Sequence, residues 1–188
     1  MKKVLLPLAK GFEEIEAVSI IDVLRRAEIE VLVAALEHEL LVKGANSIVI
    51  QADLQVKDIT SDEIDMIVLP GGWGGTYALA DDVNVQRLLQ EMDAKGKNIA
   101  AICAAPFALN KAGVLKEKYT CYPSVEEEIQ RAGYQGDASM VVDDANIMTS
   151  RGPATAICFA LEIVKKLKGE ESYNSVKTGI LATYCTGE

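Results

Sequence analysis

The sequence of 188 residues contains a single histidine, His38, and only four cysteines. One histidine excludes a multi-histidine metal site, and neither a Ser–His–Asp triad nor a Cys–His dyad can be built without it. His38 lies between glutamates in the segment LEHEL, which is typical of a solvated edge, and we expect no catalytic role for it. No CxxC pair or zinc framework is formed by the cysteines, which are Cys103, Cys121, Cys158 and Cys185. We therefore expect no metal site.

Long hydrophobic runs are also missing, because no apolar stretch approaches the ~20 residues that span a bilayer. The N-terminal run MKKVLLPLAK is interrupted by Pro7 and Lys10, and no small-residue cleavage pattern follows it. We interpret it as a first buried strand and not as a signal peptide. Without an export signal we expect a cytoplasmic protein with reduced thiols, in which Cys121, Cys158 and Cys185 act as small buried hydrophobic residues.

Positive charge is scarce, since 19 basic residues stand against 28 acidic ones and the formal net charge is −9. Such a surface repels phosphate backbones and offers nothing basic and amphipathic to a membrane, so we expect neither nucleic acid nor membrane as a partner. The chain also lacks internal repeats, low-complexity tracts and linkers. Its length suits one well-cored domain, and we expect a single domain over residues 1–188.

What the chain does contain is an alternation of strand-like and helix-like segments. Short apolar runs typical of buried strands occupy residues 4–8, 31–35, 66–69 and 98–102, with shorter strands near 139–142 and 147–149 and a hairpin within 39–56. Helical patterns occupy residues 13–27, 83–95, 104–111, 154–167 and 170–183. This alternation predicts an α/β fold with a mostly parallel sheet and helices on both faces. Ligand sites in such folds lie at the carboxyl ends of the strands, here residues 9–16, 70–76, 103–106 and 150–154.

Cys103 is the first candidate functional residue. It follows a predicted strand, precedes a predicted helix and stands among small residues in NIAAICAAPF, a pattern that indicates a nucleophile elbow. A helix N-terminus and its free amides favour a thiolate, so we expect a pKa below that of a free thiol. The alternative is a small buried residue that ends a strand.

The glycine-rich stretch LPGGWGG at residues 69–75 matches neither phosphate-loop pattern. It either lets backbone amides approach a ligand closely or forms a plain tight turn. The segment TSRGPAT at residues 149–155 is similarly a helix cap or part of a site.

An acidic residue at the start of the helix over 13–27 is the third candidate. Glu16 shares the core-facing side of that helix with Ile20 and Leu24, and Glu13 lies near the same side, whereas Glu14 points elsewhere. A buried carboxylate needs a partner. The alternative is that these are first-turn acids that complement the helix dipole, which suits Glu13 and Glu14 well. Helix periodicity leaves both Glu13 and Glu16 as functional candidates.

Taken together, the segments LAKGFEEIEAV, IDVLRRAEIEV, IVLPGGWGG, IAAICAAP and TSRGPATA resemble the ThiJ/PfpI family, in particular its parkinsonism-associated deglycase subfamily. They occur in order and extend over nearly the whole chain, and four linked motifs are more specific than any one alone. The resemblance implies a flavodoxin-like three-layer α/β sandwich, a homodimer and one ThiJ/PfpI-type domain over 1–188.

The resemblance also assigns the site. It implies Cys103 as nucleophile, Glu16 as the acid that hydrogen-bonds the sulfur, and the amides of Gly72 and Ala104 as oxyanion donors. Further residues that it brings to the site are Arg26, Arg151, Gly152 and Pro153. Two positions depart from the family: Asn46 stands where relatives carry a second arginine, and Tyr122 replaces a histidine found in relatives with glyoxalase activity. A phenol is too weak a base at neutral pH to replace an imidazole, so proton transfer falls to Glu16 or to water.

Two functions follow. The first is a cofactor-free glyoxalase or deglycase that acts on α-oxoaldehydes such as methylglyoxal and glyoxal or on their thiol and amine adducts. The second is an oxidative-stress sensor or redox-regulated chaperone that uses oxidation of Cys103. An amidase or peptidase needs a Cys–His pair and is disfavoured, because His38 lies outside every matched segment.

Overall fold

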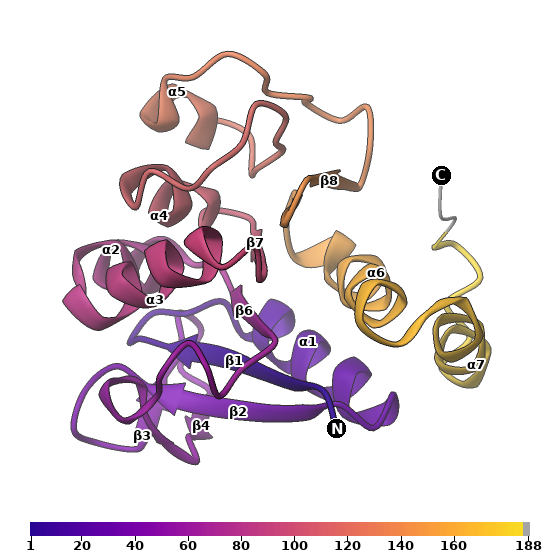
Figure 1. Cartoon of the computed structure of the whole chain (residues 1–188), viewed down its shortest axis with the longest axis horizontal. Coiled ribbons are helices and arrows are strands. Elements are labelled where there is room, and N and C mark those ends of the chain that lie inside the picture. The colour runs from indigo at the N-terminus through magenta and orange to yellow at the C-terminus, as the bar shows by residue number, and fades with distance from the viewer. Residues whose placement is uncertain (186–188) are drawn as a thin grey trace.

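A computed structural model describes residues 1–185, and a seven-stranded sheet forms its centre (Figure 1). The strand order is β5-β2-β1-β6-β7-β9-β8, and every pairing in this sheet is parallel apart from β8 with β9. The strands are β1 (Lys3–Leu8), β2 (Glu30–Ala35), β5 (Leu54–Gln55), β6 (Met66–Leu69), β7 (Asn98–Ile102), β8 (Val141–Asp144) and β9 (Ile147–Ser150). The predicted mostly parallel sheet is therefore confirmed.

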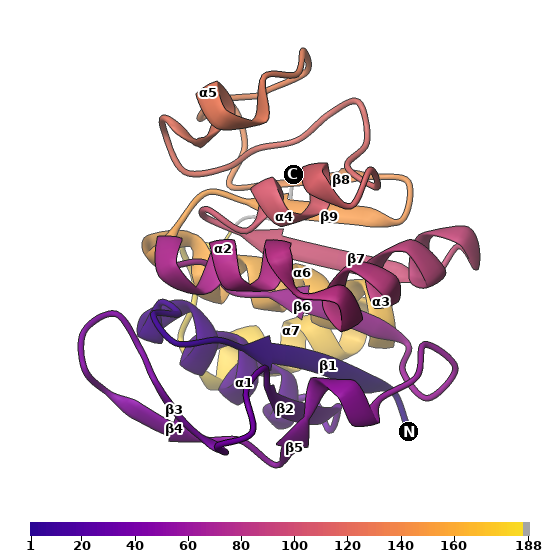
Figure 2. The same cartoon turned by 90° about the vertical axis from the view of Figure 1, so that its left-hand side faces the viewer.

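The central strands are apolar throughout because helices cover both of their faces. All four residues of β6 and the last four of β7 are buried. On one face α1 (Glu14–Arg26), α6 (Ala156–Lys168) and α7 (Glu170–Gly179) pack together, and on the other α2 (Trp73–Asp81), α3 (Val83–Ala94) and α4 (Pro106–Lys111) do so (Figures 1 and 2). The three-layer α/β sandwich is thus as expected. Within residues 1–185, no helix is long and apolar enough to cross a bilayer.

The remaining elements are short. Two 3₁₀ turns, η1 (Val56–Asp58) and η2 (Pro153–Thr155), and the helix α5 (Val125–Ile129) lie in connections. The predicted hairpin is also present, as β3 (Leu41–Lys43) paired antiparallel with β4 (Val49–Gln51).

Glu14 lies in the first turn of α1, as expected, and it also connects this hairpin to the helix. Its carboxylate is buried and accepts hydrogen bonds from the Asn46 amide at 2.6 Å and the Asn46 side chain at 3.0 Å. Burial opposes its ionisation, but these bonds hold its pKa below the usual value. Asn46 therefore holds the hairpin loop against α1, and its side chain is engaged there.

Helix α2 is not among the helices that the sequence predicts, because its first three residues are Trp73, Gly74 and Gly75 and glycine is a poor helix former. At the other end of the chain, α7 stops at Gly179, four residues before the predicted end. Element type is predicted well here, and glycine positions account for these two differences.

The expectation that all four thiols are reduced is wrong, because Cys158 of α6 and Cys185 form a disulfide. Their separation of 27 residues matches no motif, so nothing in the spacing signals the pair. Cys103 and Cys121 are free and buried, as expected for Cys121. The disulfide fastens the segment that follows α7 to the neighbouring helix α6.

We predict that Cys185→Ser destabilises the protein by about 3.5 kcal/mol, because the bridge closes a loop of 27 residues and limits the unfolded chain. For a chain of this size that corresponds to a fall in melting temperature of roughly 10 °C. Calorimetry measures the melting temperatures of the wild type and the variant, each with and without a dithiol reductant. The reductant should lower the melting temperature of the wild type and leave that of the variant unchanged. Equal melting temperatures in all samples would contradict the bridge.

Candidate active site

Cys103 lies where the chain leaves β7 and turns toward α4. Its φ is +63°, in the left-handed region that residues with a Cβ rarely adopt. The turn is fixed on both sides, because the Cys103 amide donates to the Ser150 carbonyl at 3.0 Å and the Tyr122 amide donates to the Cys103 carbonyl at 2.9 Å. A strained cysteine at the carboxyl end of a central strand has the geometry of a nucleophile elbow.

Glu16 supplies the carboxyl group at this cysteine. It is completely buried, and its Oε2 accepts a hydrogen bond of 2.7 Å from the Gly71 amide. Its Oε1 is buried and has no hydrogen-bond partner among the described residues. The Cys103 thiol lies close enough to the carboxyl group to lower its pKa, as the Gly71 amide also does. Glu13 is instead the N-cap of α1, where its Oε2 accepts from the Glu16 amide at 2.8 Å. Helix periodicity left both Glu13 and Glu16 as functional candidates. In the structure Glu13 is the helix cap and Glu16 is the buried acid.

Burial raises the pKa of Glu16 to about 7, against opposing contacts with the Gly71 amide and the Cys103 thiol. Burial also raises the pKa of Cys103, as do the charge and hydrogen bond of Glu16, while the amides of Gly72 and Ala104 lower it. The depressed thiol pKa expected from the sequence is therefore wrong for this pair. The cysteine precedes the N-cap of the six-residue α4 by two positions, so the helix dipole is too weak to offset the loss of water.

Gly71 is a site residue that the sequence reasoning missed. A Cβ at this position would lie 2.6 Å from the Cβ of Cys103 and 2.7 Å from Oε2 of Glu16. Glycine is therefore what allows the loop after β6 to lie this close to both the thiol and the carboxyl group. Gly71 is visible in the sequence as the first glycine of the Gly-rich stretch, but only the packing distinguishes its role from those of the neighbouring glycines.

Two other glycines of this stretch let the loop approach backbone closely. A Cβ at Gly72 would lie 2.4 Å from the Gly11 carbonyl oxygen, and one at Gly75 would lie 3.0 Å from Phe12. Gly72 also has a φ of +88°, which orients its amide toward the Cys103 sulfur. The loops after β1 and β6 therefore touch directly, and the site lies against their junction.

Tyr122 lies next to the cysteine through its backbone, and its ring remains 47% exposed. Gly152 gives this ring room, because a Cβ there would lie 3.2 Å from Tyr122 Cδ2. Pro153 begins η2 directly afterwards. These residues border the cysteine from the β9 side.

Arg26 is placed differently from the expectation. Arg26 ends α1, roughly 15 Å along the helix axis from Glu16, and pairs with Asp22 at 2.8 Å. Within one chain it does not line Cys103. The charge of Arg151 acts on Cys121, whose pKa burial raises to about 12 against that charge. His38 is exposed, as predicted.

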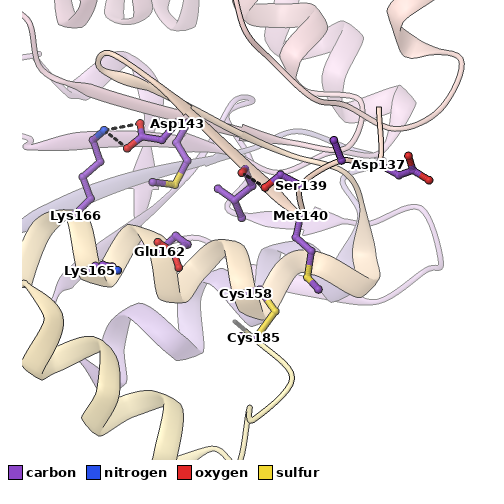
Figure 3. A pocket seen from close by; sticks show the side chains of 12 residues that line it. Asp137, Ser139, Met140, Asp143, Cys158, Glu162, Lys165, Lys166 and Cys185 are labelled. Atoms are coloured by element: carbon purple, nitrogen blue, oxygen red, sulfur yellow. Dashed lines mark hydrogen bonds and ion pairs between the residues drawn. A yellow bond between two sulfur atoms is a disulfide. The ribbon is translucent and has the colours of Figure 1, made fainter. Parts of the chain in front are cut away.

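A cavity of about 540 Å³ lies away from this site, between α6, β8 and the segment that ends at Cys185 (Figure 3). Cys103 and Glu16 are not among its lining residues. The lysines that line it are paired, Lys166 with Asp143 at 2.6 Å and Lys165 with Glu170 at 2.9 Å. Neither lysine is therefore free to act as a nucleophile in this cavity.

The class that the fold and site define is a three-layer α/β protein with a strained cysteine beside a buried glutamate. A family model described as the DJ-1/PfpI family matches residues 2–166, and the chain belongs to that family. It is 42% identical over 184 residues to Protein dj-1beta of Drosophila melanogaster, covering 97% of this chain and 98% of that protein. The crystal structure of Drosophila DJ-1beta has a TM-score of 0.90 at 43% identity, covering 96% of this chain and 97% of that chain.

A relative from Caenorhabditis elegans, named glutathione-independent glyoxalase DJR-1.2, is 38% identical over 174 residues. The match covers 92% of this chain and 91% of that protein. The family resemblance of the sequence motifs is thereby confirmed, together with the flavodoxin-like fold that it implies.

We predict that Glu16 makes the folded state less stable as pH rises. Its folded pKa is about 7 against an ordinary 4.5, so between these values the folded protein keeps a proton that the unfolded chain has lost. The stabilisation is complete below pH 4.5 and is lost as pH rises through 7, a change on the order of 3 kcal/mol. Urea unfolding at pH 5 and pH 8 measures it. Glu16→Gln should remove this slope while all other groups remain, and parallel pH profiles for the two proteins would contradict it.

Proposed function

We propose that the chain is a cysteine-dependent, cofactor-free glyoxalase or deglycase that acts on α-oxoaldehydes such as methylglyoxal and glyoxal, or on their thiol and amine adducts. The observation that carries the proposal is a strained Cys103 beside a buried Glu16 whose Oε1 has no hydrogen-bond partner among the described residues. The name of the C. elegans relative, a glutathione-independent glyoxalase, supports the same reaction.

The first step is addition of the Cys103 sulfur to the aldehyde carbon. An S–C bond forms, the carbonyl π bond breaks, and negative charge develops on the oxygen beside the amides of Gly72 and Ala104. Because the pKa of the thiol is raised, its proton must be removed as the bond forms. Oε1 of Glu16 takes that proton and delivers it to the oxygen, which completes a hemithioacetal.

The second step moves a proton between carbons. Glu16 removes the hydrogen of the former aldehyde carbon and returns it to the neighbouring carbonyl carbon through an enediol. A carboxyl group with a pKa of about 7 is close to half protonated at neutral pH, so one side chain can serve as base and then as acid. Glu16 thus takes the role that the family resemblance implies for a histidine in relatives, where this chain has Tyr122.

Water then attacks the resulting thioester, the C–S bond breaks and the Cys103 thiol is restored. Methylglyoxal plus water gives lactate, and glyoxal gives glycolate. The aldehyde carbon is oxidised while its neighbour is reduced within the same molecule. The reaction balances without an external oxidant, reductant or cofactor.

We predict that Cys103→Ala abolishes conversion of methylglyoxal to lactate, and that Glu16→Gln lowers kcat about 10²- to 10⁴-fold because the proton-transferring group is lost. Lactate formation measured by chromatography is the readout. Glu13→Gln is the matched control: it keeps an acceptor for the helix cap and should retain activity within about threefold. Lactate production by Cys103→Ala at the wild-type rate would disprove the mechanism.

The alternative function is a redox sensor or redox-regulated chaperone at Cys103. Two amides that face the sulfur, those of Gly72 and Ala104, would also hold the oxygens of a sulfinate. Burial and the raised thiol pKa oppose this alternative, because the thiolate is the species that peroxide oxidises.

We predict that a mild dose of peroxide adds oxygen to Cys103 no faster than to Cys121, since burial raises the pKa of both thiols. Peptide mass spectrometry over a time course provides the measurement, with the Cys103→Ala variant as the reference for Cys121. Selective oxidation of Cys103 in a protein that turns over no dicarbonyl would favour the sensor instead.

A further inference from the structure

Aromatic residues are few in this chain, with one Trp, six Tyr and three Phe. Three of them, Trp73, Tyr77 and Phe107, form one cluster, which we call the aromatic patch. Trp73 and Tyr77 stack with ring centroids 5.1 Å apart, and the Phe107 ring meets them edge-on at 6.3 and 5.6 Å. Trp73 is 36% exposed and Tyr77 is 47% exposed. A contiguous group of exposed rings in a chain so poor in aromatics marks a binding surface.

Two members of the aromatic patch directly follow the loops that surround Cys103. Trp73 follows Gly72, whose amide faces the Cys103 sulfur, and Phe107 lies in the first turn of α4, just after the cysteine turn. Helices α2 and α4 pack side by side, and both begin at the carboxyl edge of the sheet (Figure 2). Side chains of a helix tilt toward its N-terminus, so the rings in these first turns lean toward the edge that carries Cys103.

The size of the aromatic patch argues for a small ligand. Each ring side chain has about 200 Å² to bury and less than half is exposed here, so the patch offers no more than about 300 Å². A stable dimer buries about 800 Å² on each partner. One aryl ring of a substrate, stacked on Trp73 while its carbonyl group lies at the sulfur, matches the available area.

We propose that the aromatic patch binds the aryl group of the substrate, and that the site prefers aryl α-oxoaldehydes such as phenylglyoxal to methylglyoxal. This inference rests on the proposed function, and the chemistry is unchanged: phenylglyoxal plus water gives mandelate by the same internal transfer of hydrogen. Trp73 and Phe107 act as specificity residues that position the ring, and they take no part in proton transfer.

The kinetic test is the ratio of kcat/KM for phenylglyoxal to kcat/KM for methylglyoxal. Trp73→Ala should lower this ratio about tenfold because a stacked ring contact is lost. Trp73→Phe should recover most of it. The matched control is Tyr184→Ala, which removes an exposed ring far from α2 along the chain and should leave the ratio unchanged. Melting temperatures show that each variant is folded. An unchanged ratio in Trp73→Ala would overturn the inference.

A binding test separates this inference from the proposed function, because it uses the Cys103→Ala protein, which has no nucleophile. Trp73 is the only tryptophan, so its fluorescence reports on the aromatic patch alone. Phenylglyoxylate and pyruvate carry the same charge, and only the first should cause a saturable change. Saturation without any turnover by the wild type would refute the enzyme and keep the site. Turnover of methylglyoxal with equal responses to both probes would refute the site and keep the enzyme.

The competing occupant of the aromatic patch is a second copy of the chain. Light scattering of the wild type and Trp73→Ala distinguishes the two. A change from dimer to monomer in the variant would overturn the small-ligand proposal, and an unchanged mass supports it.

Discussion

The carboxyl group of Glu16 has no access to water, and the architecture around it follows from that fact. A buried carboxylate is unfavourable without partners, and here one oxygen accepts from the Gly71 amide while the other has no hydrogen-bond partner among the described residues. The Cys103 thiol lies beside the group. Because the two groups interact directly, they titrate as a coupled pair and not independently. The chemistry available at Cys103 is therefore governed by where a proton resides and less by the nucleophilicity of a free thiolate.

For the Glu16 carboxyl group to lie this close to Cys103, the loops after β1, β6 and β7 must meet with almost no side-chain volume between them. Gly71 leaves the space in which the thiol and the carboxyl group face each other, and Gly72 and Gly75 let the loop after β6 rest on Gly11 and Phe12. Backbone hydrogen bonds to Ser150 and Tyr122 hold the strained turn at Cys103, and they do not depend on any contact of the sulfur. Packing of backbone against backbone thus positions the reactive pair.

Local patterns predicted the strands, most helices and the turn at Cys103, because apolar periodicity and small residues act over short distances. Helix periodicity reduced the acid to Glu13 or Glu16, since both lie near one face, and only tertiary packing separates the cap from the buried acid. The Cys158–Cys185 bridge and the direction of the thiol pKa were missed for a related reason. Both depend on which distant residues meet and how much water they exclude, and no spacing along the chain encodes that.

The limited exposure of Cys103, 9%, also constrains what can react there. Only a small group such as an aldehyde carbon can enter far enough to reach the sulfur, and the rest of the substrate must remain outside on the surface. Exposed residues around Cys103 then set the selectivity between substrates that have the same reactive carbon. Their contacts with the substrate need not change during the reaction. Uniform binding of that kind alters KM more than kcat. Under the proposed function, the buried pair determines which reaction occurs, and exposed residues around it determine which molecule undergoes it.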